Sequence, residues 1–495
     1  MMYGEEKSDS LIVAANLANN PQGAESVERR SGAKGNAEQP HMRRTQSRES
    51  MSQRLSRVRE AAKQRKKERF TALFHLLTAE ALENAFLSLS RKAAAGVDGV
   101  RWKDYAENLK VNIADLHRRL HQGSYRAQPG RRHYIPKADG KQRPLGIASL
   151  EDKIVQYALV KILNAVYEND FMGFSYGFRP GRSQHNALDA LATGLVRTNV
   201  NWVLDADISQ FFDKVSHEWL IRFIEHRIGD QRVIRLIRKW LTAGTSEEGE
   251  WRASEEGTPQ GAVISPLLAN IYLHYVFDLW AHQWRRRHAT GNVVMVRYAD
   301  GIVIGFDKRI DAQCFRIAMQ RRLKEFGLTV HPKKTRLMEF GRFAAENRAS
   351  RGKGKPETFN FLGFTHISGK DRSGRFMLIR KTRRDRMTAT LKAIKDGLRK
   401  RWHYSIPEQG KWLRRVVQGY LNYHSVPGNY PMMRKFRIYV TDLWRRALRR
   451  RSQQDDTTWT KANRLAAVWL PKVRVLHPWP VERFTARHPR QEPGA

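Results

Sequence analysis

Cysteine is nearly absent from the sequence, which contains Cys314 alone. One cysteine excludes a disulfide framework and any zinc module built from paired cysteines. Long apolar runs are missing as well, so no segment is suited to cross a bilayer. The short apolar stretch 11–18 has acidic flanks, which argues against a secretory signal. We therefore expect an intracellular, cytoplasmic protein that does not enter a membrane.

Acidic residues are scarce relative to basic ones. The chain has 90 Lys and Arg against 49 Asp and Glu, a formal net charge of +41 over 495 residues. The positive residues run through the whole chain, so they are not confined to one basic tail. This charge indicates a polyanionic partner, nucleic acid in preference to an anionic membrane surface. Length allows two or three domains.

Two apolar stretches carry carboxylates that burial in a strand would normally exclude. Residues 202–208 have the pattern of a buried strand and include Asp205 and Asp207. Residues 293–306 contain two β-branched runs around Asp300-Gly301, which is a strong signal for a tight hairpin. Asp-Gly turns are common and mostly not catalytic, so the hairpin alone has an ordinary explanation. A carboxylate on a core strand beside another at a hairpin tip, however, can hold divalent cations for in-line phosphoryl transfer.

Composition and hydrophobic periodicity divide the chain into four parts. They are a disordered basic tail, a region of mixed helices and strands, a helix-only region and a basic C-terminal segment, over residues 1–65, 66–370, 371–451 and 452–495. The tail is predicted to be at most transiently helical, near 52–69. Three amphipathic patterns in the helix-only region predict a small bundle with Trp412 and Trp444 in its core.

Three further segments are candidate contacts for an anionic ligand. Residues 134–147 predict a hairpin with Lys137 and Arg143 on its arms, suited to gripping a triphosphate or simply carrying surface charge. The loop 175–183 is dense in glycine, aromatic residues and arginine; it either approaches a nucleic-acid strand or is a packed connector. The last predicted helix carries arginines outside its apolar face. The candidate nucleic-acid contacts are Arg179 and Arg182 in the loop and Arg434, Arg437, Arg445, Arg446, Arg449 and Arg450 on the helix.

Seven motifs, in order and spacing, resemble the group II intron reverse transcriptase/maturase family over roughly residues 70–484. They are Ala95-Gly96-Val97-Asp98-Gly99, Ile135-Pro136-Lys137, Ser175-Tyr176-Gly177-Phe178-Arg179-Pro180, Asp207-Ile208-Ser209-Gln210-Phe211-Phe212-Asp213, Thr258-Pro259-Gln260-Gly261, Arg297-Tyr298-Ala299-Asp300 and Phe361-Leu362-Gly363-Phe364. One such motif is a weak signal, whereas seven ordered blocks are a strong one. Many family members carry a C-terminal nuclease module with paired Cys and His ligands. With Cys314 alone, we expect this chain to lack a Cys-built version.

The resemblance implies an α+β protein with the right-hand polymerase architecture: fingers and palm, followed by an all-helical thumb, also called the maturase or X domain. The family copies its intron RNA into DNA and binds that RNA to assist splicing. The implied activity is therefore that of an RNA-directed DNA polymerase, a nucleotidyltransferase, with maturase activity in splicing and mobility. The implied partners are group II intron RNA, an RNA template with a DNA primer made elsewhere, and target DNA. The implied cofactor is Mg²⁺ in a two-metal site.

The same resemblance implies roles for individual residues. Asp207 and Asp300 would be the catalytic carboxylates and, with Ile208, would hold the metal ions. The residues implied to contact the incoming nucleotide are Lys137, Arg143, Phe212, Gln260 and Lys334, with Phe212 as the gate against a 2′-hydroxyl. Two cations stabilise both the attacking 3′-oxygen and the leaving pyrophosphate, so the chemistry requires no general-base residue.

One position departs from the family pattern. That pattern has a second aspartate directly after Asp300, where this chain has Gly301. Asp207 and Asp300 can still bridge cations, and Asp205 lies on the same strand face as Asp207. Two hypotheses follow: an active polymerase with maturase activity, or a splicing maturase whose polymerase site is impaired by Gly301. A third, a basic RNA-binding protein without catalytic history, predicts neither the strand carboxylates nor the ordered loops.

Overall fold

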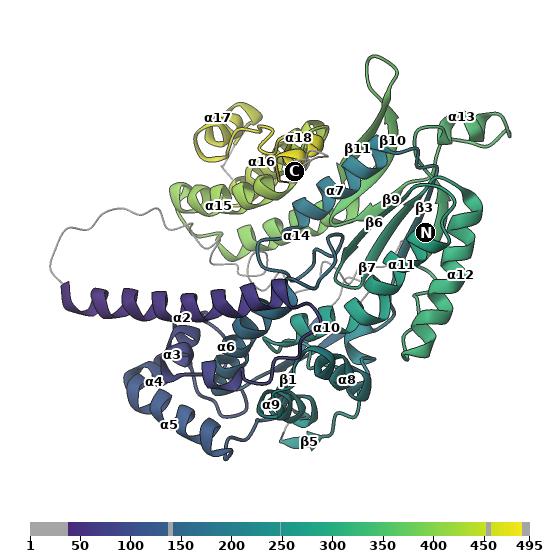
Figure 1. Cartoon of the computed structure of the whole chain (residues 1–495). Helices are drawn as coiled ribbons and strands as arrows, with labels where there is room; N and C mark the ends of the chain where they lie inside the picture. The colour runs from purple at the N-terminus through teal and green to yellow at the C-terminus, as the bar shows by residue number, and fades with distance from the viewer. Residues whose placement is uncertain (1–37, 137–141, 248, 452–456, 488–495) are drawn as a thin grey trace.

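The computed structural model describes residues 38–136, 142–247, 249–451 and 457–487, and Figure 1 shows helices packed around and between sheets. Over these residues the strands form two four-stranded sheets and one three-stranded sheet. This mixture of helices and sheets confirms the predicted α+β class. None of the helices in the described part combines the length and the apolar character that a membrane crossing requires.

The central sheet has the strand order β6-β7-β3-β8 and is antiparallel throughout. Its strands are β3 (Trp202–Asp207), β6 (Val293–Tyr298), β7 (Gly301–Phe306) and β8 (Arg336–Glu339). The hairpin predicted over 293–306 is confirmed, but its turn is not Asp300-Gly301. Tyr298 pairs with Gly301, so the turn residues are Ala299 and Asp300, and Ala299 has a φ of 54°. Gly301 extends β7 and lies opposite Asp207.

The two faces of this sheet pack on different cores, because side chains alternate along each strand. Leu204 and Ala206 join a large core with the helices that follow residue 265. Val203 joins a second core with α7 (Gln184–Arg197) and the third sheet. Asp205 and Asp207 share the face of Val203. The helices of the first face are α10 (Ser265–Leu273), the π-helical turn η4 (His274–Asp278), α11 (Leu279–Arg287) and α12 (Arg309–Glu325).

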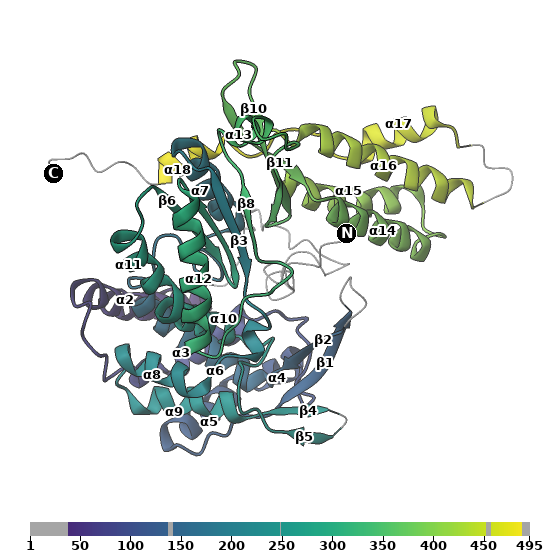
Figure 2. The same cartoon turned by 90° about the vertical axis from the view of Figure 1, so that its right-hand side faces the viewer.

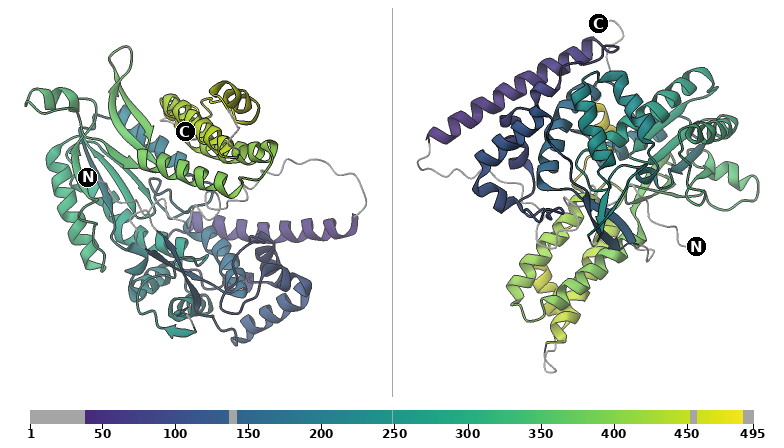
Figure 3. Two further views of the ribbon diagram at one scale, coloured as in Figure 1. Left: turned by 180° about the vertical axis from the view of Figure 1, so that it is seen from behind. Right: turned by 90° about the horizontal axis from the view of Figure 1, so that it is seen from below.

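The N-terminal helices lie at one end of the molecule (Figure 1). Figure 3 shows the long helix α2 (Glu38–Gln64) along their outer edge. Ala62 is fully buried, and Met51 and Leu55 pack against the large core. The prediction of a disordered tail is therefore wrong for α2, because tertiary packing over residues 51–62 supplies the partner that this weakly amphipathic helix lacks locally. The following helices are η2 (Phe74–Leu76), α3 (Ala79–Ser88), α4 (Trp102–Glu107), α5 (Leu109–Gln122) and α6 (Leu150–Tyr167).

A second four-stranded sheet has the order β2-β1-β4-β5. The antiparallel strands β1 (Gly130–Pro136) and β2 (Gln142–Ile147) confirm the predicted basic hairpin, whose tip lies outside the described residues. The sequence pattern did not predict the short hairpin of β4 (Thr245–Glu247) and β5 (Glu250–Arg252), because three-residue strands show no detectable period. The helices α8 (His217–Arg227) and α9 (Gln231–Thr242) lie between β3 and this hairpin.

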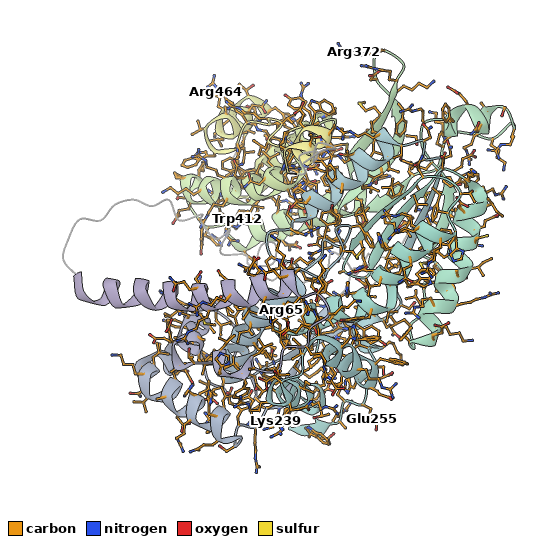
Figure 4. All side chains as sticks on the ribbon, in the orientation of Figure 1. Arg65, Lys239, Glu255, Arg372, Trp412 and Arg464 are labelled. Carbon is orange, nitrogen blue, oxygen red and sulfur yellow. The ribbon has the colours of Figure 1, made fainter. Side chains whose placement is uncertain are left out.

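The third sheet consists of β9 (Phe359–Phe361), β10 (Phe364–Lys370) and β11 (Phe376–Thr382), preceded by the short helix α13 (Ala344–Ala349). Figure 4 shows Arg372 at the outer end of the β10–β11 hairpin. The boundary predicted at residue 371 therefore falls inside this hairpin, and the helix-only part begins at α14 (Arg384–Lys400).

The helical domain comprises α14, α15 (Ile406–His424), α16 (Tyr430–Arg449) and α17 (Trp459–Trp469). Its core contains Trp412 and Trp444, as predicted. Figure 2 shows this domain and the β1–β2 hairpin on the same side of the central sheet. The last helix, α18 (Pro480–Arg487), returns to pack on α7, where Arg483 pairs with Asp189.

Candidate functional site

The two carboxylates at the centre of the sequence prediction lie at the same end of neighbouring strands. Asp207 is the last residue of β3, and Asp300 is in the turn between β6 and β7. The Ile208 amide donates to the Asp300 carbonyl oxygen at 3.4 Å, and the His331 amide donates to the Asp207 carbonyl oxygen at 2.7 Å. Asp207 is 6% exposed and Asp300 is fully buried. The strand pairing thus brings together two acidic residues that are far apart in the sequence.

A cation and a third carboxyl group accompany Asp207. Lys334 Nζ lies 3.4 Å from Asp207 Oδ2. On the same face of β3, burial raises the pKa of Asp205 to about 7; Arg336 lowers that pKa and Asp207 raises it. Burial is the main cause, because the charged carboxylate loses hydration, and the nearby Asp207 carboxylate adds a smaller effect in the same direction. Carboxyl groups and the cationic Lys334 and Arg336 therefore lie together at this end of the sheet.

The donor set fits a divalent cation that keeps part of its water shell. Among the residues that the structure describes, no three His, Cys, Asp or Glu side chains are grouped so as to hold a metal ion by themselves. Mg²⁺ retains several waters and is usually bound by one or two carboxylates together with substrate phosphates. Asp207 and Asp300 match that pattern. These residues fit a Mg²⁺ site completed by substrate, and they do not fit a cage made of protein alone.

The loop that carries Gln260 is tied to the turn that carries Phe212. Phe212 is buried in the 3₁₀ turn η3 (Phe211–Asp213), just after β3. Gln260 Nε2 donates to Asp213 Oδ1 at 2.6 Å, and the Thr258 amide donates to the Phe212 carbonyl oxygen at 2.7 Å. Two predicted nucleotide-pocket residues from different motifs therefore belong to one connected structure.

Glycines permit this close approach. A Cβ at Gly257 would lie 2.9 Å from the Phe212 carbonyl oxygen, and a Cβ at Gly261 would lie 3.1 Å from the Gly146 carbonyl oxygen. Both glycines have left-handed φ angles, 86° and 104°, that side chains disfavour. The Gly146 amide of β2 donates to the Gln260 carbonyl oxygen at 2.7 Å. The loop therefore also joins the β1–β2 hairpin.

Of the three cations predicted to contact a nucleotide, two are described by the structure. Arg143 is half-buried on β2, opposite Ile135. Lys334 contacts Asp207. Lys137 lies outside the described residues. The roles of these residues toward a nucleotide stay predictions.

A buried ion pair beneath the hairpin turn was not found from the sequence. Arg297 and Asp278 are both fully buried, with Arg297 Nη2 2.6 Å from Asp278 Oδ2 and Arg297 Nε 2.7 Å from Asp278 Oδ1. Arg297 belongs to one of the seven motifs, but neither its spacing nor the family resemblance implied a role for it. The available signal was an arginine inside an otherwise apolar strand, which requires a buried partner.

Arg179 does not match its predicted role as a nucleic-acid contact. It is 5% exposed, and its guanidinium donates to Glu168 at 3.0–3.2 Å and to the carbonyl oxygens of Met172 and Ser175 at 2.8 Å. Its N–H groups are thus used inside the protein, because this loop packs as a connector. Arg182 is half-buried and also donates to carbonyl oxygens of the same segment.

The predicted arginines of α16, together with Arg450 directly after it, divide into two groups. The exposed group, still candidates for nucleic-acid contact, is Arg434, Arg446, Arg449 and Arg450. The other two are half-buried and hold α17. Arg437 donates to the carbonyl oxygens of Ala466 at 2.8 Å and Pro471 at 3.1 Å, and Arg445 lies 4.9 Å from the ring of Trp459. Both guanidinium groups are therefore engaged within the helical domain, and their nucleic-acid role stays a prediction, because an amphipathic pattern alone does not show which polar residues face another helix.

Residues 135–366, which include both carboxylates and the central sheet, match the family described as "Reverse transcriptase (RNA-dependent DNA polymerase)". The chain therefore contains a reverse transcriptase domain. Domains of this class generally depend on divalent metal ions.

Three relatives refine this assignment. Protein YkfC of Escherichia coli (strain K12) is 43% identical over 206 residues, 41% of this chain and 54% of that protein. An uncharacterized 91 kDa protein in the cob intron of Schizosaccharomyces pombe is 42% identical over 172 residues, 34% of this chain and 21% of that protein. Group II intron-encoded protein LtrA of Lactococcus lactis subsp. cremoris is 37% identical over 223 residues, 44% of this chain and 37% of that protein. Over this region the chain is similar to proteins encoded by group II introns that carry a reverse transcriptase domain. Its matches span about half of the first relative and less of the other two.

Proposed function

We propose that this protein is a group II intron RNA-directed DNA polymerase that also binds its intron RNA as a splicing maturase. The observation that supports this best is the meeting of Asp207 and Asp300 at one end of the central sheet, inside the matched reverse transcriptase region. In this proposal the central sheet is the palm, and the N-terminal helices with the β1–β2 hairpin are the fingers. The helical domain of α14 to α17 is the thumb.

The proposed site works by positioning and electrostatics. Mg²⁺ bound at Asp207, Ile208 and Asp300, in a two-metal arrangement, would supply stabilisation of the charge on the attacking 3′-oxygen and the leaving pyrophosphate. The two aspartates provide the negative charge that this binding requires. Lys334 lies beside Asp207. Once the Asp207 carboxylate is neutralised by Mg²⁺, the Lys334 ammonium group can pair with the nucleotide phosphates instead.

The nucleotide pocket in this proposal is built from three segments that already contact one another. Arg143 on β2 contacts the triphosphate, and Gln260 lines the pocket, held by Asp213. Phe212 packs under the sugar and excludes a 2′-hydroxyl. Because Phe212 is fixed by the Thr258 amide, it offers a rigid surface for this discrimination.

Nucleic-acid binding in this proposal uses the exposed arginines of α16 and the net charge of +41. The proposed partners are group II intron RNA, an RNA template with a DNA primer, and target DNA. Many phosphate contacts make such binding steeply dependent on salt. We place the protein in the cytoplasm, a reducing compartment that suits its one free cysteine.

Primer extension on an RNA template tests the polymerase. The protein should extend a DNA primer with Mg²⁺, and Asp207→Ala should lower the rate about 1,000-fold, on the scale of losing one key electrostatic group. The exposed Asp396→Ala on α14 is the matched control and should extend normally. RNA binding and thermal stability of Asp207→Ala should stay near those of the unaltered protein. Absence of extension by the unaltered protein in both Mg²⁺ and Mn²⁺, or full activity of Asp207→Ala, would refute the polymerase proposal.

A splicing assay tests the maturase half separately. Intron RNA that splices slowly alone should splice faster with the protein, and Asp207→Ala should retain this effect because it leaves the α16 surface intact. A protein that does not accelerate splicing would contradict the maturase role while leaving the polymerase proposal standing.

A further inference from the structure

The turn that carries Asp300 has a backbone that alanine does not adopt readily. Ala299 has a φ of 54°, in the left-handed region that favours glycine. Such strained residues persist where the surrounding structure over-determines them, and they cluster at functional sites. The contacts that hold this turn therefore bear directly on the position of the Asp300 carboxylate.

One side chain, Arg297, joins this turn to the buried helices and to the loop 175–183. Besides its two bonds to Asp278, its Nη1 donates to the Ala299 carbonyl oxygen at 2.9 Å and to Asn270 Oδ1 at 3.1 Å. Its Nη2 donates to Ser175 Oγ at 2.7 Å. All five N–H donors of the guanidinium are thus used. The Ala299 carbonyl belongs to the planar peptide unit that joins Ala299 to Asp300. The hydrogen bond from Arg297 Nη1 to this carbonyl oxygen therefore fixes the orientation of the peptide plane and, with it, the position of the Asp300 Cα.

The partner of Arg297 sits at an irregular point of the buried helix. Asp278 is the last residue of the π-helical turn η4 between α10 and α11. Turns of this kind arise from one inserted residue and are frequent at functional sites. On the preceding helix, Asn270 Nδ2 donates to the Gly177 carbonyl oxygen at 2.7 Å. A Cβ at Gly177 would clash with the Ala299 nitrogen, so this loop packs directly against the turn.

We propose that the buried Asp278–Arg297 pair is a positioning device that sets the turn carrying Asp300 and thereby the metal-binding geometry; this rests on the proposed function. Stability alone does not account for the pair, because buried ion pairs contribute little or unfavourable net stability compared with apolar residues of similar size. The pair fixes direction: one planar group donates one bond to the turn at Ala299 and four bonds that anchor the guanidinium to Asp278, Asn270 and Ser175. Asp278 and Arg297 themselves touch no substrate in this proposal.

The decisive variant replaces both charges with apolar side chains of similar size, Asp278→Leu with Arg297→Met. A purely structural pair can be exchanged in this way with little loss of thermal stability. Replacement of a positioning pair should lower activity even if the protein stays folded, because the Ala299 carbonyl oxygen loses its hydrogen-bond donor. We expect kcat for primer extension to fall about 10- to 100-fold, with KM for the template–primer unchanged, which is the usual cost of removing a group that orients a metal ligand.

Mn²⁺ affinity gives a readout that does not depend on turnover. Mn²⁺ binding, followed by the EPR signal of the free ion, should weaken about tenfold in the double variant. Ser175→Ala removes one bond to Arg297 and leaves the ion pair in place, so it should shift kcat and Mn²⁺ affinity in the same direction but less. It also keeps the test open if the double variant does not fold. Arg297→Lys keeps the charge without the planar fork and should recover only part of kcat.

A second buried pair provides the matched control. Arg227 Nε lies 2.8 Å from Asp170 Oδ2, with side chains 2% and 12% exposed. Asp170→Leu with Arg227→Met should leave kcat and Mn²⁺ affinity unchanged whatever it does to stability. The inference is overturned if the Asp278–Arg297 double variant retains both full kcat and full Mn²⁺ affinity. If the unaltered protein extends no primer, the proposed function fails, and the Mn²⁺ comparison still decides the positioning role.

Discussion

The central sheet region buries charged side chains, whereas the helical domain exposes them to solvent. In the sheet region, Asp300, Arg297 and Asp278 are fully buried, and Asp207 nearly so. In the helical domain the core is formed by aromatic and aliphatic residues such as Trp444, and the exposed arginines of α16 lie on the outside. Both regions come from the same strongly basic chain.

The difference follows from what each region must hold. A metal and phosphate site needs negative groups in fixed positions away from bulk water, so the sheet buries charge and compensates it with dense hydrogen bonding. A surface for a nucleic-acid backbone needs positive charge in contact with solvent, carried on a scaffold stabilised by apolar packing. Substitutions in the helical domain should therefore act mainly on stability and binding, and those in the sheet mainly on chemistry.

Trp444→Ala should give the largest effect on stability. Trp444 is 1% exposed, and its Nε1 donates to Oε1 of the fully buried Gln409 at 2.9 Å. Losing the ring and stranding Gln409 should lower the unfolding free energy of the helical domain by about 4 kcal/mol. Urea unfolding and limited proteolysis would show it. Trp459→Ala, at a 44% exposed position of the same domain, should cost about 1 kcal/mol or less; equal losses would break the contrast between core and surface.

Gly301→Asp should give the largest gain in catalytic activity. Gly301 lies in strand conformation opposite Asp207, so an aspartate there needs no left-handed backbone. It would add a carboxylate beside Asp207 and Asp300, and we expect DNA synthesis to rise about 100-fold. Without metal, the facing carboxylates should lower stability by about 0.5 kcal/mol. Primer-extension rates with Mg²⁺ measure the gain, and an unchanged rate would show that the site does not use a third carboxylate.

Acid should weaken the junction between the two regions through His424, at the end of α15. Burial lowers the pKa of His424 to about 4, and its ring lies 4.2 Å from Tyr420 and 5.5 Å from Phe364 of β10. The folded-state pKa is below the unfolded value near 6.5, so this contribution is complete above pH 6.5 and is lost as the pH falls toward 4. At pH 5 the loss should be about 2 kcal/mol. Urea unfolding at pH 7.5 and pH 5 should show a smaller difference for His424→Gln, and an identical difference would contradict the assignment.

Arg449→Gln with Arg450→Gln should give the smallest effect. Both arginines are exposed on the outer part of the helical domain. If each contacts one phosphate, the slope of log affinity against log salt should fall by about 2, with little effect on stability. The control is Arg321→Gln with Lys324→Gln on α12, which removes the same charge from the helix covering the other face of the central sheet. Equal slopes for the two double variants would mean that binding follows net charge and not this surface.

The sequence was sufficient where a pattern is local and long. The amphipathic helices of the helical domain, the burial of Trp412 and Trp444, and the β6–β7 hairpin follow from periodicity. The sequence also indicated that Asp207 and Asp300 lie near each other, because a carboxylate in an apolar strand is costly to bury unless it has a partner or a bound cation. Local pattern failed for α2, whose apolar side chains find their partners in the large core.

Charged residues show most clearly what only the fold decides. Arg179, Arg437 and Arg445 look like surface cations in the sequence, yet each is held by internal partners. Arg297 looks like one residue of a strand, yet it connects the Asp300 turn to η4 and the loop beneath it.

The sequence by itself determined the chemical inventory of this protein: which carboxylates can meet, how basic the chain is and which segments form helices or strands. Tertiary structure decided which of those charges face solvent and which are enclosed, and it placed the hairpin turn one residue earlier than Asp-Gly predicted. The physical reason is the difference in sequence distance over which these effects act. Periodicity and turn preference act over a few residues, whereas the cost of burying a charge depends on partners that the fold brings from distant positions.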